Sequence, residues 1–259
     1  MKALHIAATG MKAQELNVEV ISNNLANMRT TGYKRQRAEF QDLLYQNLRR
    51  MGTETSDAGT LVPTGVQIGS GVRTAATSRI MSQGNVESTE KDLDVAVKGE
   101  GFFQIDLPDG TTAYTRDGSF ERDADGQLVT VDGYTLQPGI TIPDDALDIT
   151  ISTDGQVQGT VNGNVQTFGQ IQLARFTNKA GLQAIGENLF LETEASGAPQ
   201  VSNPGDDSTG TLLHKYLEMA NVEAVTEITD LISAQRAYEM NSRVIQAADE
   251  MMQTSSQLR

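Results

Sequence analysis

The sequence predicts an α+β protein in which helices from the two ends of the chain pair as a coiled coil. A mainly antiparallel β domain is inserted between them in the sequence. Apolar residues recur at alternating spacings of three and four at both ends, which is the pattern of paired helices. The middle of the chain instead shows short segments of alternating polarity separated by turn residues. The fold is therefore discontinuous. We expect paired helices over 1–30 and 221–259, extended connectors over 31–75 and 195–220, and an outer β domain over 76–194.

The first helix is expected over residues 2–28. Its apolar seam comprises Leu4, Ala7, Met11, Gln14, Val18, Ile21, Leu25 and Met28. Gly10 interrupts the helix at a cost of about 1 kcal/mol relative to alanine. The amides of Asn23, Asn24 and Asn27 cluster near its end, where they either terminate the helix or make specific contacts between subunits. Thr31-Gly32 then ends the helix.

The segment after the first helix is expected to be a connector. Residues 33–50 combine scattered apolar residues with charges, which suggests an extended stretch followed by a short helix. Residues 51–71 are rich in Gly, Thr and Ser and lose all periodicity. This second stretch is either a flexible loop or a strap that becomes ordered on contact with neighbouring subunits.

Short strands are expected from residue 72 to residue 192. Six turn dipeptides punctuate them and can supply the positive φ that tight hairpins require. They are Asp109-Gly110, Asp117-Gly118, Asp125-Gly126, Asp132-Gly133, Asp154-Gly155 and Asn162-Gly163. Close spacing of strands and turns indicates antiparallel pairing. Residues 195–211, rich in Gly, Pro, Ser and Asp, are expected to form another strap.

The last helix is expected over residues 221–258. Its seam comprises Leu231, Ala234, Tyr238, Asn241, Ile245, Ala248, Met252 and Ser255. The apolar stripe on both terminal helices is narrow, so the isolated pair should be only marginally stable. Further apolar residues lie off the seams, namely Val20, Val225, Ile228, Ile232, Val244 and Met251. We therefore expect the chain ends to become ordered on assembly, with neighbouring subunits supplying the remaining burial.

Composition restricts the class of protein. The chain of 259 residues has a net charge of −14 and no cysteine, which removes disulfides and thiolate chemistry. Residues 29–50 are locally basic, but residues 51–220 hold 24 acidic against 9 basic residues, so we expect no binding to nucleic acid. No apolar run approaches the length of a membrane span, and polar residues interrupt any secretory signal at the N-terminus.

The sequence holds no constellation typical of an enzyme or a cofactor site. An EF-hand-like spacing of oxygen ligands occurs at Glu121, Asp123, Asp125, Gly126, Leu128 and Asp132, but its first and last positions are wrong for calcium and the flanking helices are missing. We interpret it as an acidic hairpin turn; a secreted calcium-binding β enzyme or adhesin would depend on it. His5 and His214 are too few for a zinc site or a catalytic triad. We therefore expect no catalytic residue, cofactor or metal.

Several motifs together resemble the bacterial flagellar rod and hook family, with similarity along essentially the whole chain. They are Ser22–Asn27 (SNNLAN), Thr31–Lys34 (TGYK), Leu93–Phe103 (LDVAVKGEGFF), Tyr114–Phe120 (YTRDGSF) and Gln235–Ser242 (QRAYEMNS). Three further segments and the chain length most resemble the distal-rod members of this family. These segments are Leu43–Gln46, Pro63–Val72 and Gly186–Asn188.

The resemblance implies a structural subunit of a helical, tubular homopolymer in the flagellar basal body, a rod that spans the periplasm and transmits torque from motor to hook. The terminal helices would form the inner wall around an export channel, with the β domain outside. The implied partners are further copies of the chain, the proximal rod proteins, the hook protein, the peptidoglycan and outer-membrane ring proteins, and the flagellar type III export apparatus. The alternative within this family is a proximal rod or hook-type component.

The resemblance also assigns roles to particular residues. The subunit-packing residues of the terminal helices would be Leu4, Met11, Val18, Ile21, Leu25, Asn23, Asn24, Asn27, Leu231, Tyr238, Asn241, Ile245 and Met252. A segment corresponding to roughly 46–63 is associated with straightness and stiffness in distal-rod members of the family. Here that strap contains Met51, Leu61 and Pro63. Its deletion between Met51 and Leu61 should soften or curve the polymer.

Overall fold

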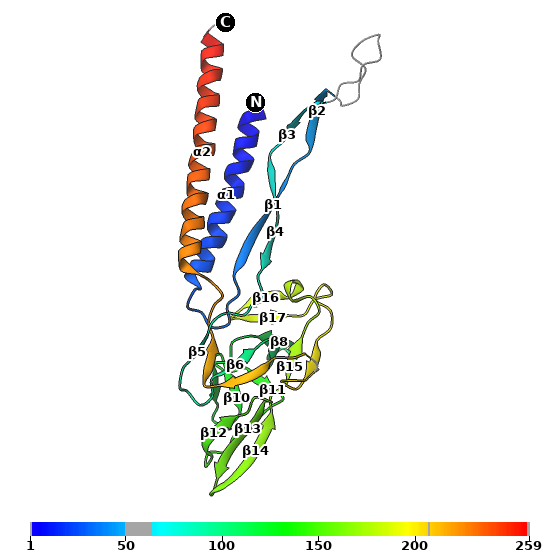
Figure 1. Ribbon diagram of the computed structural model, residues 1–259, viewed down its shortest axis with the longest axis vertical. Helices are drawn as coiled ribbons and strands as arrows, with labels where there is room; N and C mark the ends of the chain where they lie inside the picture. The colour runs from blue at the N-terminus through cyan, green and yellow to red at the C-terminus, as the bar shows by residue number, and fades with distance from the viewer. Residues whose placement is uncertain (1, 50–63, 207, 258–259) are drawn as a thin grey trace. The chain divides into compact units, whose positions relative to one another are not determined.

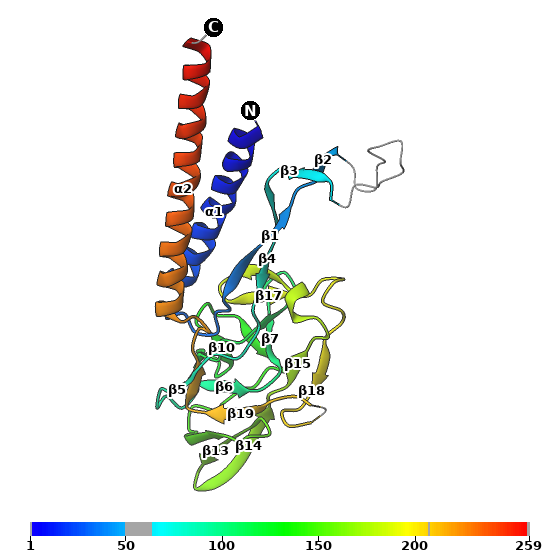
Figure 2. The ribbon, with the colours of Figure 1, turned by 45° about the horizontal axis from the view of Figure 1, so that its top comes forward.

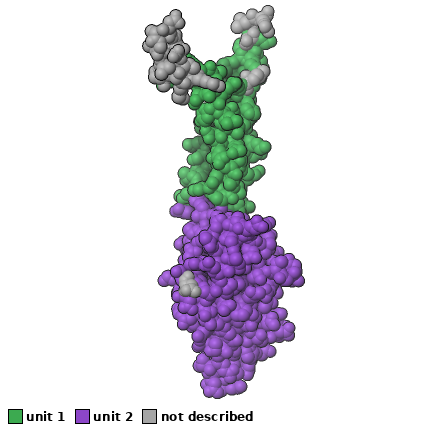
Figure 3. All heavy atoms as spheres, turned by 90° about the vertical axis from the view of Figure 1, so that its right-hand side faces the viewer, with its two compact units in different colours: residues 1–25, 36–78, 224–259 green, residues 26–35, 79–223 purple. Residues whose placement is uncertain are grey.

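A computed structural model describes residues 2–49, 64–206 and 208–257, with only the backbone described at residues 255 and 257. The chain divides into two compact units. Unit 1 comprises residues 1–25, 36–78 and 224–259, and unit 2 comprises residues 26–35 and 79–223 (Figure 3). The chain thus passes between the two units at four points along the sequence, at 25/26, 35/36, 78/79 and 223/224. The strap residues Met51, Leu61 and Pro63 lie outside the described residues.

Unit 1 contains two long helices and a narrow β ribbon. Helix α1 spans Lys2–Ala26 and helix α2 spans Ala224–Gln257, and the two run antiparallel side by side (Figures 1 and 2). The ribbon consists of β1 (Gln36–Asp42), β2 (Tyr45–Arg49), β3 (Val66–Gly69) and β4 (Val72–Arg79). Strand β1 pairs with β4, and β2 pairs antiparallel with β3. Neither described helix is long and apolar enough to cross a membrane.

The expected helix in the second half of 33–50 is wrong, because this segment forms β1 and β2 instead. Its leucines are spaced as on a helix, but the segment finds a partner strand much later in the chain. Tyr45 lies opposite Gly69 in that pairing, and the tyrosine ring packs over the glycine. The partner strand β3 falls within residues 51–71, where no regular element was expected.

Unit 2 is an antiparallel β domain, as the sequence predicted. Its first strands are β5 (Val86–Ser88), β6 (Val95–Lys98), β7 (Phe102–Asp106), β8 (Thr112–Thr115), β9 (Phe120–Arg122), β10 (Leu128–Thr130), β11 (Thr135–Gln137) and β12 (Leu147–Ile151). The others are β13 (Gln156–Val161), β14 (Asn164–Gln170), β15 (Leu173–Arg175), β16 (Gln183–Gly186), β17 (Leu189–Leu191), β18 (Gln200–Ser202), β19 (Thr211–His214) and β20 (Tyr216–Glu218). A short 3-10 helix covers Lys179–Gly181.

The central sheet of unit 2 runs in the order β16-β17-β8-β7-β11-β10-β9, and β15 joins it by pairing with both β7 and β18. Strand β18 lies in residues 195–211, where we expected only a strap. Strands β12, β13 and β14 form a separate sheet, and β6–β19 and β5–β20 form two-stranded pairs. The core between these sheets is apolar and includes edge-to-face aromatic pairs such as Phe103 with Phe120, whose ring centroids lie 5.1 Å apart.

Two of the predicted turn dipeptides illustrate different uses of glycine. Asn162 and Gly163 both adopt positive φ, at 50° and 82°, and form the tight hairpin between β13 and β14. Gly118 instead allows two backbone segments to approach, because a Cβ added there would lie 1.7 Å from the carbonyl oxygen of Val95. Five of the six predicted dipeptides thus form hairpins with a glycine at positive φ, but the prediction is wrong for Asp117-Gly118. That dipeptide joins β8 and β9, which do not pair with each other in the described sheets, and its glycine is needed for the close approach of Val95.

Candidate functional site

Antiparallel pairing of α1 and α2 is fixed by contacts near both ends of α1. Near the start of α1, Gly10 faces Asn241, and a Cβ added at Gly10 would lie 2.9 Å from the Nδ2 atom of Asn241. Near its end, the Nδ2–H of Asn24 donates to the Oε2 atom of Glu227 over 3.1 Å. The glycine that weakens the helix locally therefore makes room for an amide side chain of the partner helix.

Asn24 also joins these helices to the ribbon. Its Nδ2–H donates to the carbonyl oxygen of Gln36 over 2.8 Å, and its Oδ1 atom accepts the N–H of Gln36 over 2.9 Å. The side chain is almost fully buried. One amide thus connects the end of α1, the start of β1 and the start of α2. The sequence alone left open whether this amide cluster ends the helix or makes contacts between subunits. In the structure, Asn24 sets the register of α1 against β1 and α2 within the chain.

The remaining predicted packing residues differ in exposure. Ile21 is buried, Tyr238 and Asn23 are exposed, and the others are half-buried, namely Leu4, Met11, Val18, Leu25, Asn27, Leu231, Asn241, Ile245 and Met252. Ala7, Ala234 and Ala248 of the predicted seams are also buried. Sequence reasoning missed the burial of Ala13, and it left Val20 to be covered by neighbours although this chain itself buries it.

Helix α2 carries large apolar side chains that unit 1 leaves exposed. They are Val225, Ile228, Ile232, Tyr238, Met240, Val244 and Met251. Val225, for example, is 73% exposed. Ile232 precedes the buried Ala234 by two residues, which at about 100° per residue places it on nearly the opposite side of the helix. Such a concentration of exposed apolar groups marks an interaction surface.

The ribbon carries a second set of exposed apolar side chains. It comprises Leu44, Tyr45, Leu48, Val66 and Ile68 on β2, β3 and the residue before β2. Leu44 is 87% exposed. A two-stranded ribbon has little apolar surface of its own to bury and is marginal in isolation. Both long features of unit 1, helix and ribbon, therefore present apolar surface to solvent.

Two grooves in unit 1 have opposite charge. The groove between α1 and α2 has a volume of about 390 Å³ and is lined by Glu15, Val18, Glu19, Gln235, Tyr238 and Glu239. The groove between α1 and the ribbon has a volume of about 410 Å³ and is lined by His5, Thr9, Lys12, Ala13, Leu43, Val72, Arg73 and Thr74. The first groove therefore attracts cations and the second attracts anions.

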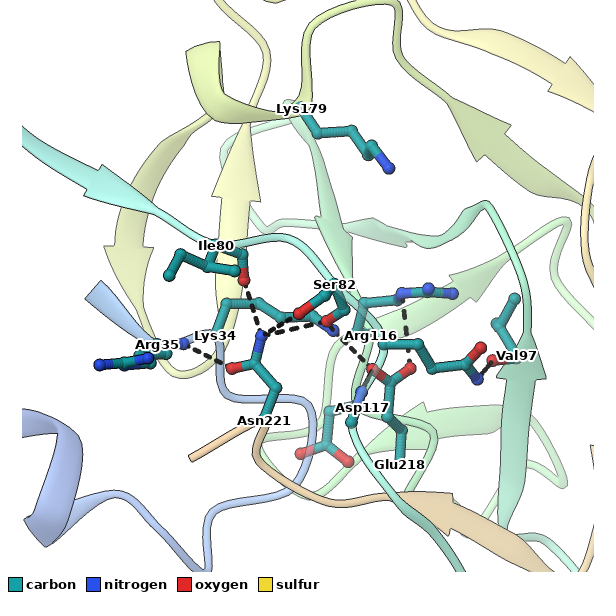
Figure 4. A network of polar contacts seen from close by, with 12 residues as sticks. Lys34, Arg35, Ile80, Ser82, Val97, Arg116, Asp117, Lys179, Glu218 and Asn221 are labelled. Carbon is teal, nitrogen blue, oxygen red and sulfur yellow. Dashed lines mark hydrogen bonds and ion pairs between the residues drawn. The ribbon is translucent and has the colours of Figure 1, made fainter. Parts of the chain in front are cut away.

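A buried ionic cluster lies in unit 2 (Figure 4). Lys34 Nζ lies 2.5 Å from Glu218 Oε1 and also donates to the carbonyl oxygen of Ser82 over 2.9 Å. Arg116 Nε lies 3.5 Å from Glu218 Oε2, and the Nη2–H of Arg116 donates to the carbonyl oxygen of Gly99 over 2.6 Å. Burial lowers the pKa of Lys34, and the carboxylate of Glu218 opposes that shift.

Asn221 extends this cluster to neighbouring segments. Its Oδ1 atom accepts the N–H of Arg35 over 2.7 Å, and its Nδ2–H donates to the carbonyl oxygens of Ile80 and Ser82 (Figure 4). Residues 34–35, 80–82 and 218–221 lie, in sequence, near three of the four points at which the chain passes between the units. The cluster therefore holds together three segments of unit 2 that lie close to these points.

The Thr31-Gly32 and Asp117-Gly118 motifs meet beside this cluster. Thr31 Oγ1–H donates to Asp117 Oδ2 over 2.7 Å, and the N–H of Gly32 donates to the carbonyl oxygen of Glu218 over 2.7 Å. Gly32 has φ of 67°, and a Cβ there would lie 2.7 Å from the backbone nitrogen of Asp117. Two motifs that lie far apart in the sequence thus form one packed contact.

The acidic 121–132 segment is the hairpin between β9 and β10, as we interpreted it. The N–H of Gly126 donates to the carbonyl oxygen of Asp123 over 2.9 Å and closes the turn. His5 is exposed on α1, and His214 Nε2 lies 2.7 Å from the carbonyl oxygen of Asp92. Across residues 2–49, 64–206 and 208–257, no three His, Cys, Asp or Glu residues are grouped so that they could hold a metal ion.

Comparison with known families matches three parts of this chain. Residues 4–34 match a model described as flagella basal body rod protein, and residues 96–159 match the flagellar hook protein FlgE/F/G D1 domain. Residues 214–258 match the flagellar basal body rod FlgEFG protein C-terminal model. These matches cover α1 with the turn after it, part of the β domain, and α2 with the strand before it.

Individual relatives extend the similarity to the full chain. The flagellar basal-body rod protein FlgG of Caulobacter vibrioides is 59% identical over 261 residues, covering 100% of both chains. The proteins of the same name from Agrobacterium fabrum and Bacillus subtilis are 56% and 39% identical, each covering at least 97% of both chains. The chain therefore belongs to the flagellar basal-body rod protein family and is a structural component of the bacterial flagellar rod.

Proposed function

We propose that this chain is the subunit of the distal rod, where it assembles into a helical tubular drive shaft that transmits torque from motor to hook and encloses the export channel. The observation that carries this proposal is the apolar surface of α2 that points away from α1. A helix that pairs within its own unit on one side and exposes Val225 and Ile232 on the other is suited to contacts with further copies. The full-length similarity to rod proteins supports the same role.

In this proposal α1 and α2 form an antiparallel coiled coil that lines the inner wall. The subunit-packing residues are those predicted from the sequence on α1 and α2, from Leu4 to Asn27 and from Leu231 to Met252. Residues 76–194, together with strands β18, β19 and β20 that pair with them, form the outer β domain, and residues 31–75 connect it to the wall. The segment 46–63, with Met51, Leu61 and Pro63, stiffens the rod.

The proposed partners follow from this place in the flagellum. Further copies of the chain contact one another along the rod, proximal rod proteins lie below, and the hook protein lies above. Peptidoglycan and outer-membrane ring proteins surround the shaft in the periplasm, and the type III export apparatus delivers the subunits. The chain catalyses no reaction and binds no nucleic acid in this role. The alternative role is that of a proximal rod or hook-type component of the same axial structure.

Sedimentation of the purified chain tests whether the exposed face of α2 drives assembly. Ile232→Asp places a charge in that face and should abolish the fast-sedimenting polymer, because a contact would then bury an unpaired carboxylate. Leu147→Asp is the matched control, since Leu147 is 68% exposed on β12 in unit 2. Equal polymer yields from both variants would contradict the proposed role of this face.

A further inference from the structure

We propose that the groove between α1 and α2 binds the arginine face of α2 from a second copy of this chain. The arginine face is defined by Ile232, Arg236, Met240, Arg243 and Val244. This inference rests on the proposed function, because it names the two surfaces that meet when copies of the chain assemble.

The groove combines an apolar floor with an acidic rim. Val18 and Tyr238 supply the floor, while Glu15, Glu19 and Glu239 supply the rim, and no basic residue lines it. Glu15 and Glu19 stand four residues apart and therefore on the same side of α1. None of the three carboxylates makes an ion pair in the part of the chain that the structure describes. A cation on an aliphatic stem would satisfy both the rim and the floor.

The arginine face has the complementary composition. Arg236 and Arg243 are seven residues apart, and each follows by two residues a position directed at α1, Ala234 in one case and Asn241 in the other. Both arginines therefore project from the side of α2 opposite α1. Ile232, Met240 and Val244 beside them are exposed.

These arginines are not used within the described chain. Glu239 stands three residues after Arg236 and four residues before Arg243, which are spacings at which helical ion pairs form. No such pair exists among the described residues, since each ion pair found there involves other side chains. Both guanidinium groups are thus available to carboxylates of another copy.

The groove between α1 and the ribbon does not compete for the arginine face. Its lining includes Lys12 and Arg73 and contains no acidic residue. Like charges brought together across an interface are unfavourable, so this groove repels the arginine face. Of the two grooves, only the one between α1 and α2 has the charge that the arginine face requires.

The proposed contact also has the symmetry that a polymer needs. The groove and the arginine face adjoin at Glu239 but are otherwise formed by different residues, so one copy can offer its groove to one neighbour and its arginines to another. Such a heterologous contact generates rings or helical filaments, whereas a self-complementary contact stops at a dimer. The contact therefore propagates along an assembly.

Thiol crosslinking tests the contact, because the natural chain has no cysteine. Glu19→Cys/Arg243→Cys would be expressed as the sole copy in cells, and basal bodies isolated from them would be treated with a short bismaleimide. Val18→Cys/Val244→Cys is a second pair that keeps every charge. Lys98→Cys/Arg243→Cys is the matched control, since Lys98 is exposed on β6 in unit 2. Within one copy, position 19 lies level with about position 232, so position 243 is roughly 16 Å further along the helix and out of reach.

We expect a ladder of dimers, trimers and higher multimers from both groove pairs and none from the control. Adding Arg243→Glu to the charge-preserving pair should lower the yield by about fivefold, the largest effect usual for one exposed ion pair. If basal bodies contain the variant chains but neither pair gives a ladder, the proposed contact is wrong. The proposed assembly into a rod is not contradicted by that result. Dimers from Arg243→Cys alone would overturn the proposed contact too, because they indicate a self-complementary contact. Absence of the natural chain from basal bodies would overturn the proposed function instead.

Discussion

Lys34 and Glu218, which are 184 residues apart in the sequence, form an ion pair whose side chains are only 1% and 0% exposed. Glu218 also faces Arg116, so one carboxylate balances two buried cations. The same carboxylate accepts the N–H of Gly84 over 3.0 Å. Removing one partner of a buried ion pair is far more costly than replacing the whole pair, because the other charge stays buried without compensation. Glu218 is therefore the residue on which this cluster depends.

Glu218→Gln should destabilise unit 2 by about 3–5 kcal/mol, since Lys34 and Arg116 would remain buried without a counter-charge. The measurement is urea unfolding followed by circular dichroism. Glu100→Gln is the control: Glu100 pairs with Lys179 at the surface, where an ion pair contributes at most about 1 kcal/mol. Equal stability of the two variants would show that the buried pair does not hold the domain together.

The contribution of Lys34 to the free energy of unfolding should increase as the pH rises. Its pKa is lowered by burial from 10.5, so between that lowered pKa and 10.5 the unfolded chain binds more protons than the folded chain. Stability from this group therefore rises with pH across that window. Burial raises the pKa of Tyr114, which has the opposite effect, so the natural chain must be compared with Lys34→Met.

The comparison is made by measuring unfolding free energies at several pH values from neutral to about 10.5. Lys34→Met keeps Tyr114 and the surface lysines, so the difference between the two pH profiles isolates Lys34. We expect the natural chain to gain stability relative to the variant as pH rises. A difference that is constant with pH would mean that Lys34 titrates as in the unfolded chain.

Asn24→Ala should loosen the junction of α1, β1 and α2. The substitution leaves the N–H and carbonyl of Gln36 and the carboxylate of Glu227 each without the bond that Asn24 makes, and each lost bond costs about 1 kcal/mol or more. Faster amide hydrogen exchange at Gln36 and in the first turn of α2 would report the effect. Ser22→Ala, at an exposed position of α1, should leave those rates unchanged.

Deleting Met51–Leu61 should soften or curve the assembled polymer if the strap stiffens the rod. The ribbon strands β2 and β3 flank this segment and pair with each other, so the deletion shortens their connection without removing either strand. Persistence length measured from electron micrographs of the polymer gives the readout. A straight polymer of unchanged rigidity would refute the role of the strap.

The regular patterns in the sequence predict much of the fold. Heptad spacings predict α1 and α2, because a helix repeats its faces over a local stretch of chain. Turn dipeptides such as Asn162-Gly163 predict antiparallel pairing for the same reason, since a hairpin joins neighbouring segments. Strand β1 lies where an extended stretch was expected, but β2 was expected to be helical. Its partner β3 lies beyond an intervening segment, and the spacing of Leu43, Leu44 and Leu48 is equally compatible with a helix.

The polar contacts of the candidate site could not be predicted in the same way. Lys34 lies in a locally basic segment, and a lone lysine in such a segment is usually a solvated surface residue. Nothing near it in sequence indicates Glu218 as a partner, because the pairing arises only when β20 and the turn after α1 come together. The sequence marks Asn24 only as part of an amide cluster, and its bonds to Gln36 and Glu227 involve residues that carry no distinguishing pattern.

Negative-stain electron microscopy of the concentrated chain tests the central claim most directly, beside a variant that lacks residues 1–28. If the paired terminal helices form the wall of a rod, the intact chain gives straight tubes and the variant gives none. Curved tubes would indicate a hook-type component. Straight tubes from the variant would contradict the claim that the paired helices build the wall.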